Sequence, residues 1–243
     1  MLLLILLIEL VILFLLSRYV TQLLYGLFLL MFRSRSVAIS TTTLLFFPGT
    51  VVHELAHLFT AEVLGVHTGK LSLVLENLEE DDLPTGRQEF QAGSVQIAKS
   101  DPFRRYAIGF APLLVGLIIL AAISYFLRSL LARPQGVSLQ DALISIVGYY
   151  LLFVISNSMF SSKEDLKGFI GFAIVLGLMV TAAYIAGIRI GLTGTALEFI
   201  NRILDGLVKS TGLVLAINGV LLLLLKVLLK LSSKLRIYIL RSR

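Results

Sequence analysis

The chain has 243 residues, of which 57% are hydrophobic and only 15% are charged, and its mean hydropathy is +0.94. Soluble domains are typically about 45–50% apolar and about 25% charged, so this composition excludes an ordinary soluble domain and predicts an integral membrane protein. The net charge of +6 does not indicate nucleic-acid binding, because the basic residues flank apolar segments, where the lipid bilayer supplies their partners.

Six apolar segments meet or approach the length of about 20 residues that a helix needs to span the hydrocarbon core. In chain order they cover residues 2–32, 38–64, 106–127, 139–160, 168–188 and 211–231. The first has no basic residues at its start and no cleavage site of small residues, so it is expected to be retained as a helix. The sequence predicts an all-α polytopic membrane protein with about six transmembrane helices, forming a single membrane domain over residues 1–243.

One long polar stretch, residues 67–105, separates the second apolar segment from the third. Apolar and polar residues alternate at its two ends, on either side of an acidic turn region that contains Pro and Gly; the apolar positions are Leu71, Leu73, Leu75, Val95 and Ile97. Alternation of this kind is typical of strands. We therefore expect a small β-hairpin or sheet inserted at the membrane surface.

The distribution of Lys and Arg predicts the orientation of the spans, because loops rich in these residues stay in the cytoplasm. Seven basic residues lie in one set of alternating loops, at 33–36, 128–138 and 189–209. Thirteen lie in the other set, at 66–105, at 161–167 and in the basic tail 226–243. The second set, together with both chain termini, is therefore expected on the cytoplasmic side. The apolar and basic pattern of the tail also matches an interfacial helix.

The second apolar segment contains the motif H-E-x-x-H, formed by His53, Glu54 and His57. On a helix the two histidines lie on one face, one turn apart, where both can bind one zinc ion while the glutamate polarises a water molecule. The alternative is that the histidines only pack or form hydrogen bonds within a helix bundle. Ionisable groups inside a membrane are costly and usually functional, so three of them within five residues favour the metal site.

A catalytic zinc ion needs a third protein ligand and an open position for water, and the chain has no cysteine to provide a thiolate. The extended signature H-E-x-x-H-x-x-G-x-x-H is excluded, because Thr60 and Val63 occupy its later positions. His67 lies past the expected helix end at Gly65 and is expected at the surface. Glu62 lies about 140° around the helix from the zinc face, and the glutamates of the following loop are expected to be solvated.

Asp165 is the best candidate for the third ligand because of its place in the predicted topology. Segments 38–64 and 139–160 run in the same direction, so their C-terminal ends share one side of the membrane, the predicted cytoplasmic one. Asp165 follows the end of the second of these segments, and an irregular stretch that dips into the bundle could carry its carboxylate to the metal. The alternative is a solvated aspartate among neighbouring charged residues.

These residues resemble the site-2 protease family of intramembrane zinc metalloproteases, and the resemblance covers roughly residues 44–170. That family carries H-E-x-x-H on one transmembrane helix and takes its third ligand from an aspartate two helices later, in a motif of the form N-x-x-P-x-P-x-L-D-G. Here Asn157 lies eight residues before Asp165, which is the same spacing, and "GFAPLLVG" at 109–116 is similar to the family's G-P-containing helix. Phe160 and Ser162 stand where prolines are common in the family.

The resemblance implies that His53, His57 and Asp165 bind Zn²⁺ as a cofactor and that Glu54 transfers protons during peptide hydrolysis. It implies a zinc metalloendopeptidase whose substrates are transmembrane or membrane-proximal proteins. Asn157 is a candidate for a hydrogen bond to the substrate backbone or to the developing oxyanion, and an interhelical hydrogen bond with Ser156 or Ser158 is the alternative.

Two other functions are compatible with the same residues. An ion transporter also places ionisable groups at mid-membrane, although the chain shows no internal repeat and no second intramembrane acidic cluster. A catalytically inert scaffold would use the metal only to stabilise helix contacts, but such a site has no need of Glu54. The sequence makes no prediction of an oligomeric state.

Overall fold

The structure is a computed structural model in which seven elements are described. The described residues are 1–72, 94–97, 101–132, 138–160, 170–171, 174–175, 177–179, 181–183, 185–187 and 194–241. The helices are α1 (Leu2–Phe32), α2 (Arg35–Val63), α3 (Pro102–Leu131), α4 (Leu139–Ser158) and α6 (Thr195–Arg241), and the strands are β1 (Thr68–Ser72) and β2 (Ser94–Ile97). Within this part of the chain, five helices are long and apolar enough to span a membrane, which identifies a multi-pass membrane protein.

The junction between α1 and α2 is a sharp turn set by two adjacent residues. Arg33 takes a left-handed backbone conformation with φ of 52°, and its N–H donates to the carbonyl of Leu29, which closes α1. Ser34 then caps α2, because its side-chain oxygen accepts from the N–H of Val37 at 3.5 Å. The two helices are therefore separate, and α1 is one continuous helix, as predicted for residues 2–32.

Capping residues also fix the starts of α3 and α4. Asp101 accepts from the N–H of Arg104 at 3.0 Å, and Pro102 occupies the first turn, where its missing N–H has no helical partner to lose. Ser138 and Asp141 form a reciprocal capping box at the start of α4. Residues within one turn of each start therefore determine where these two helices begin.

The last helix is much longer than the predicted segment 211–231, because α6 already begins at Thr195. Its first four turns carry oppositely charged side chains four residues apart. Glu198 pairs with Arg202 at 3.8 Å, and Asp205 pairs with Lys209 at 2.5 Å. Such i, i+4 pairs stabilise a helix without making it apolar, so hydropathy alone placed the helix start too late. The predicted segment 168–188 is described in part, at residues 170–171, 174–175, 177–179, 181–183 and 185–187, and most of these residues are helical.

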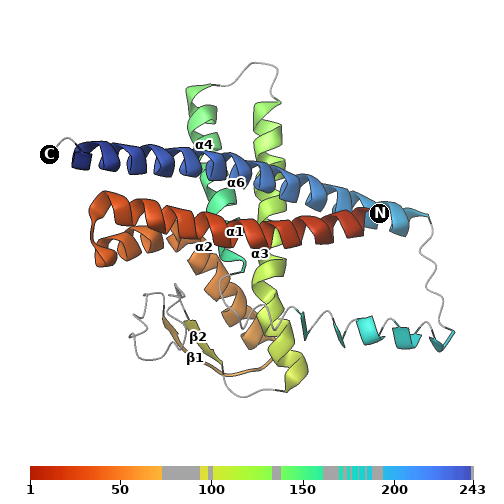
Figure 1. Cartoon of the computed structure of the whole chain (residues 1–243). Helices are drawn as coiled ribbons and strands as arrows, with labels where there is room; N and C mark the ends of the chain where they lie inside the picture. The colour runs from red at the N-terminus through yellow and green to blue at the C-terminus, as the bar shows by residue number, and fades with distance from the viewer. Residues whose placement is uncertain are drawn as a thin grey trace.

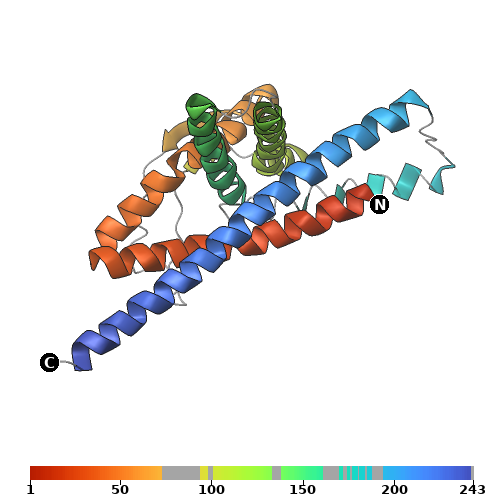
Figure 2. The ribbon, with the colours of Figure 1, turned by 90° about the horizontal axis from the view of Figure 1, so that it is seen from above.

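The helices form two groups that cross each other. In Figure 1, α1 and α6 run side by side across α3 and α4, and Figure 2 shows α2, α3 and α4 gathered on one side of the α1/α6 pair. The pair is parallel: Thr211 donates to the Glu9 carboxylate, and further along both helices the Lys226 ammonium lies 5.3 Å from the ring centroid of Tyr19. Both views place the N-terminus at one end of this pair and the C-terminus at the other.

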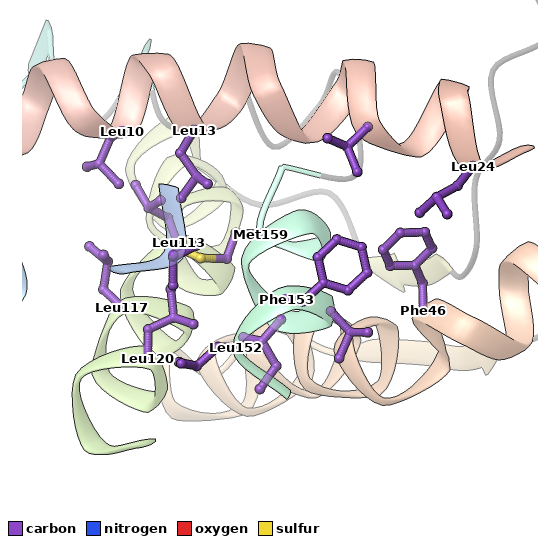
Figure 3. Packing of buried hydrophobic residues seen from close by; sticks show 14 of the residues in the cluster. Leu10, Leu13, Leu24, Phe46, Leu113, Leu117, Leu120, Leu152, Phe153 and Met159 are labelled. Atoms are coloured by element: carbon purple, nitrogen blue, oxygen red, sulfur yellow. The ribbon is translucent and has the colours of Figure 1, made fainter. Parts of the chain in front are cut away.

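The core lies where α1 crosses the other group, and Figure 3 shows side chains from α1, α2, α3 and α4 converging there. Leu13 of α1, Leu120 of α3 and Leu152 of α4 are fully buried. The outward faces of α1 and α6 are apolar as well, with Leu4 and Leu223 more than half exposed. Because lipid is as apolar as leucine, close packing rather than exclusion of water holds such helices together.

Two short strands lie between α2 and α3 in the sequence. β1 and β2 pair antiparallel, with Leu71 opposite Val95 and Ser72 opposite Ser94, and an irregularity separates Thr68 from Leu71 in the register. Most of the predicted polar stretch 67–105, including the acidic turn region, lies outside the described residues. The position of the strands at a membrane surface stays a prediction.

Candidate metal centre

Helix α2 carries the H-E-x-x-H motif and packs closely against α4. Gly49, one turn before His53, lies so near α4 that a Cβ atom there would stand 2.8 Å from the carbonyl carbon of Val154 and even nearer to the carbonyl oxygen. One turn earlier, the Tyr150 hydroxyl donates to the carbonyl of Leu45 at 2.8 Å. From the Leu45 contact to the Gly49 contact, the residue numbers increase along both helices, so α2 and α4 run in the same direction. This is the arrangement predicted for segments 38–64 and 139–160.

The three motif residues are buried in the bundle. The exposed fractions are 4% for His53, 3% for Glu54 and 7% for His57. These values are low for such polar side chains, which are rarely fully buried unless they are paired or functional. The continuous helix from Arg35 to Val63 keeps the two histidines one turn apart on one face.

The Nε2 atoms of the two imidazole rings are 3.2 Å apart. Two nitrogens that bind one tetrahedral zinc ion at about 2.0–2.1 Å are separated by about 3.3–3.4 Å, so the observed distance is close to that of a zinc-bound pair. The rings themselves are nearly perpendicular, at 85°. The same separation also suits a single hydrogen bond between the rings, and measurement of the metal content distinguishes the two.

A hydrogen bond from the neighbouring helix α3 orients the His57 ring. Nδ1 of His57 lies 2.9 Å from the backbone carbonyl oxygen of Ile108. A carbonyl oxygen can only accept, so Nδ1 must carry a proton, and in the neutral imidazole Nε2 then presents its lone pair on the side of His53. Metal-binding histidines usually have this arrangement, in which a carbonyl or carboxylate on the second nitrogen fixes the tautomer.

The described part of the chain contains no group of three His, Cys, Asp or Glu side chains that could hold a metal ion. The predicted third ligand, Asp165, lies outside the described residues, as do the glutamates of the loop after β1. His67 is exposed, as expected, and Glu62, which the sequence placed away from the zinc face, is exposed as well. The structure therefore brings together His53 and His57, and Asp165 stays a prediction.

Asn157 is held by another helix. Its Nδ2 atom donates to Oδ1 of Asn218 in α6 at 2.8 Å and to the carbonyl of Phe153 at 2.7 Å. Nδ2 of Asn218, which is fully buried, lies 3.4 Å from the Ser156 hydroxyl. This is an interhelical hydrogen bond like the predicted alternative, although its main partner is Asn218 rather than a neighbouring serine. The proposed contact between Asn157 and substrate stays a prediction.

Sequence reasoning missed two contributors to these polar contacts. Asn218 is a lone amide in an apolar run, and such a residue signals an interhelical hydrogen bond in a membrane protein. The Ile108 carbonyl could not be recognised from the sequence, because every residue has a backbone carbonyl. Its nearest signal is Pro112 in "GFAPLLVG", which the sequence associates only with the family resemblance.

Comparison with known proteins adds no assignment, since no family model, curated protein or solved structure matches the chain.

Proposed function

We propose that the chain is an intramembrane zinc metalloprotease, similar to the site-2 proteases, that hydrolyses peptide bonds of transmembrane or membrane-proximal proteins. The observation that carries this proposal is the buried pair His53 and His57, whose Nε2 atoms lie 3.2 Å apart beside a buried Glu54. Intramembrane ionisable residues usually mark function, and this trio has the composition of a zinc-peptidase site.

The course of α2 and α4 supports Asp165 as the third ligand. Because the helices are parallel and Ser158 lies opposite Gly49, the chain leaves α4 about one helical turn, or about 5.4 Å, from the level of His53. Asp165 follows seven residues after Ser158. An extended chain covers at most about 3.3–3.6 Å per residue, so this stretch is long enough to return to the histidines.

Zinc bound there would polarise the scissile carbonyl and make water nucleophilic near neutral pH. The protein's own part is to place a proton carrier beside the reacting atoms. Glu54 would accept the proton of the attacking water and deliver it to the departing nitrogen. Its burial keeps competing water away from the carboxylate and strengthens its electrostatic interactions.

A helical substrate hides its amide groups in its own hydrogen bonds, so the scissile segment has to unwind and extend before cleavage. The strand pair β1/β2 follows directly after the motif helix, and its edges offer backbone partners for an extended segment. We place this pair at the membrane surface, on the cytoplasmic side that the basic-residue counts predict for both termini and for the opening of the site.

The metal content of the purified protein tests the centre directly. We expect about one zinc ion per wild-type chain, measured by elemental mass spectrometry after detergent purification. Replacing either His53 or His57 with Ala should remove the metal, because too few protein ligands then remain to hold the ion. Asp165→Ala should weaken retention in the presence of a chelator.

His67→Ala is the matched control, since it removes the third histidine of the chain at an exposed position. It should leave the zinc content unchanged. Wild-type protein that contains no stoichiometric metal and takes none up from zinc-supplemented buffer would contradict the proposal.

A further inference from the structure

Pro112 lies inside α3, four residues after Ile108. In an α-helix the carbonyl of residue i accepts from the N–H of residue i+4. Proline has no N–H, so the carbonyl of Ile108 cannot receive the helical hydrogen bond that it would otherwise form with residue 112. Both residues are buried, and Ile108 is only 1% exposed, so water does not readily replace the missing donor.

The donor that reaches this carbonyl comes from α2. Nδ1 of His57 lies 2.9 Å from the Ile108 oxygen, within hydrogen-bond distance. The proline thus leaves a free acceptor in the second turn of α3, and the imidazole of the motif helix donates to it. The four-residue spacing between Ile108 and Pro112 is the one that allows the ring N–H of His57 to replace the backbone N–H missing at residue 112.

We propose that Pro112 is a positioning residue for the candidate metal centre: it frees the Ile108 carbonyl to hold His57 as the Nδ1–H tautomer. Nε2 of His57 is then committed as a lone-pair donor on the side where Nε2 of His53 lies 3.2 Å away. The tautomer part of this inference stands on the described contacts, and its effect on zinc rests on the proposed function.

A residue with an N–H at position 112 would restore the helical hydrogen bond to Ile108 and compete with His57 for the oxygen. The identity of its side chain should matter little, provided that the side chain fits. A proline that only filled space or bent the helix would behave differently, because a side chain of similar volume would then replace it better than a small one. Pro112→Ala and Pro112→Val separate these two roles.

The first readout is the tautomer of His57 in metal-free protein, from the ¹⁵N chemical shifts of its ring in detergent micelles. The chain has three histidines, so His53→Ala and His67→Ala assign the signals. Wild type should show His57 protonated at Nδ1. Both Pro112 variants should move the ring toward a mixture of tautomers, whereas Pro102→Ala, at the exposed first turn of the same helix, should not.

The second readout is zinc affinity, measured by competition with a chromophoric chelator. Loss of such a supporting hydrogen bond typically weakens metal binding about 10–100-fold, and we expect this range for both Pro112 variants. Circular dichroism and thermal melting confirm that each variant is folded.

An unchanged His57 tautomer in folded Pro112→Ala and Pro112→Val would overturn the inference, as would a zinc defect in the alanine variant that valine repairs. A wild type that shows the Nδ1–H tautomer and the Pro112 effect on it, but binds no zinc, would retain the positioning role and refute the metal centre. The two failures are therefore distinguishable.

Discussion

Glu54→Gln is expected to abolish proteolysis while the protein keeps its zinc. Glutamine has nearly the same shape as glutamate but cannot take a proton from water or pass one to the leaving nitrogen. A positioned general base contributes about 10²–10⁴-fold to a rate, so the rate of proteolysis should fall to background. Glu54 is no ligand in this scheme, and therefore metal content and melting temperature should stay near those of the wild type.

The measurement compares newly formed protein N-termini, labelled and identified by mass spectrometry, in membranes of host cells that express either form. Fragments cut within or beside transmembrane segments should appear with wild type and be missing with Glu54→Gln. Glu62→Gln is the matched control, because it makes the same change on an exposed residue of the same helix. Identical fragment sets from wild type and Glu54→Gln would refute the protease, and altered ion flux without fragments would identify a transporter.

Gly49→Leu is expected to prevent assembly of the motif helix with α4, and Gly49→Ala to weaken it. Even the Cβ of alanine would lie less than 3.0 Å from the Val154 backbone and from the Ser158 hydroxyl. Backbone atoms, unlike the end of a flexible side chain, cannot rotate away. Overpacking typically destabilises by about 1–3 kcal/mol, whereas alanine gains only about 0.5–1 kcal/mol over glycine as a helix former. The clash should outweigh the gain.

Thermal melting in detergent measures this effect, with about 2–4 °C expected for each kcal/mol in a chain of this size. Gly219→Ala in α6 is the control, because a Cβ there has no neighbour within 4 Å and only the helix preference changes. It should raise the melting temperature slightly or leave it unchanged. A melting temperature of Gly49→Ala equal to that of Gly219→Ala would show that α2 and α4 do not approach closely at this point.

The first four helices were predictable because their signals are local. Long apolar runs give α1, α3 and α4 their type, and Ser34, Asp101 and Ser138 are good N-caps whose effect reaches only one turn. The H-E-x-x-H motif is local too, since its geometry follows from the helix alone. The predicted start of α6 was wrong because charge pairs, rather than apolar residues, continue that helix toward Thr195.

The contacts between helices could not be predicted in the same way. The hydrogen bond from His57 to Ile108 joins residues 51 positions apart, and that from Asn157 to Asn218 joins residues 61 positions apart. Each depends on how two helices rotate and slide against one another, which no periodicity encodes. A backbone carbonyl is also invisible in a residue pattern, so the partner of His57 appears only once the helices are packed.

The parallel course of α1 and α6 has a consequence for the compartments in which the chain ends. Two helices that traverse a bilayer in the same sense begin on one face and finish on the other, which would separate the amino terminus from the carboxyl terminus. With 20 residues, α4 is about 30 Å long, which just spans the hydrocarbon core if the helix stands close to the bilayer normal. In that orientation the α1/α6 pair, which runs across α4 in Figure 1, would incline toward the plane of the lipids, and α6, at about 70 Å, is long enough to cross the core at such an inclination. An α1/α6 pair that crosses the bilayer in this way places the two chain ends in different compartments, in contrast to the shared cytoplasmic side that the loop charges predict.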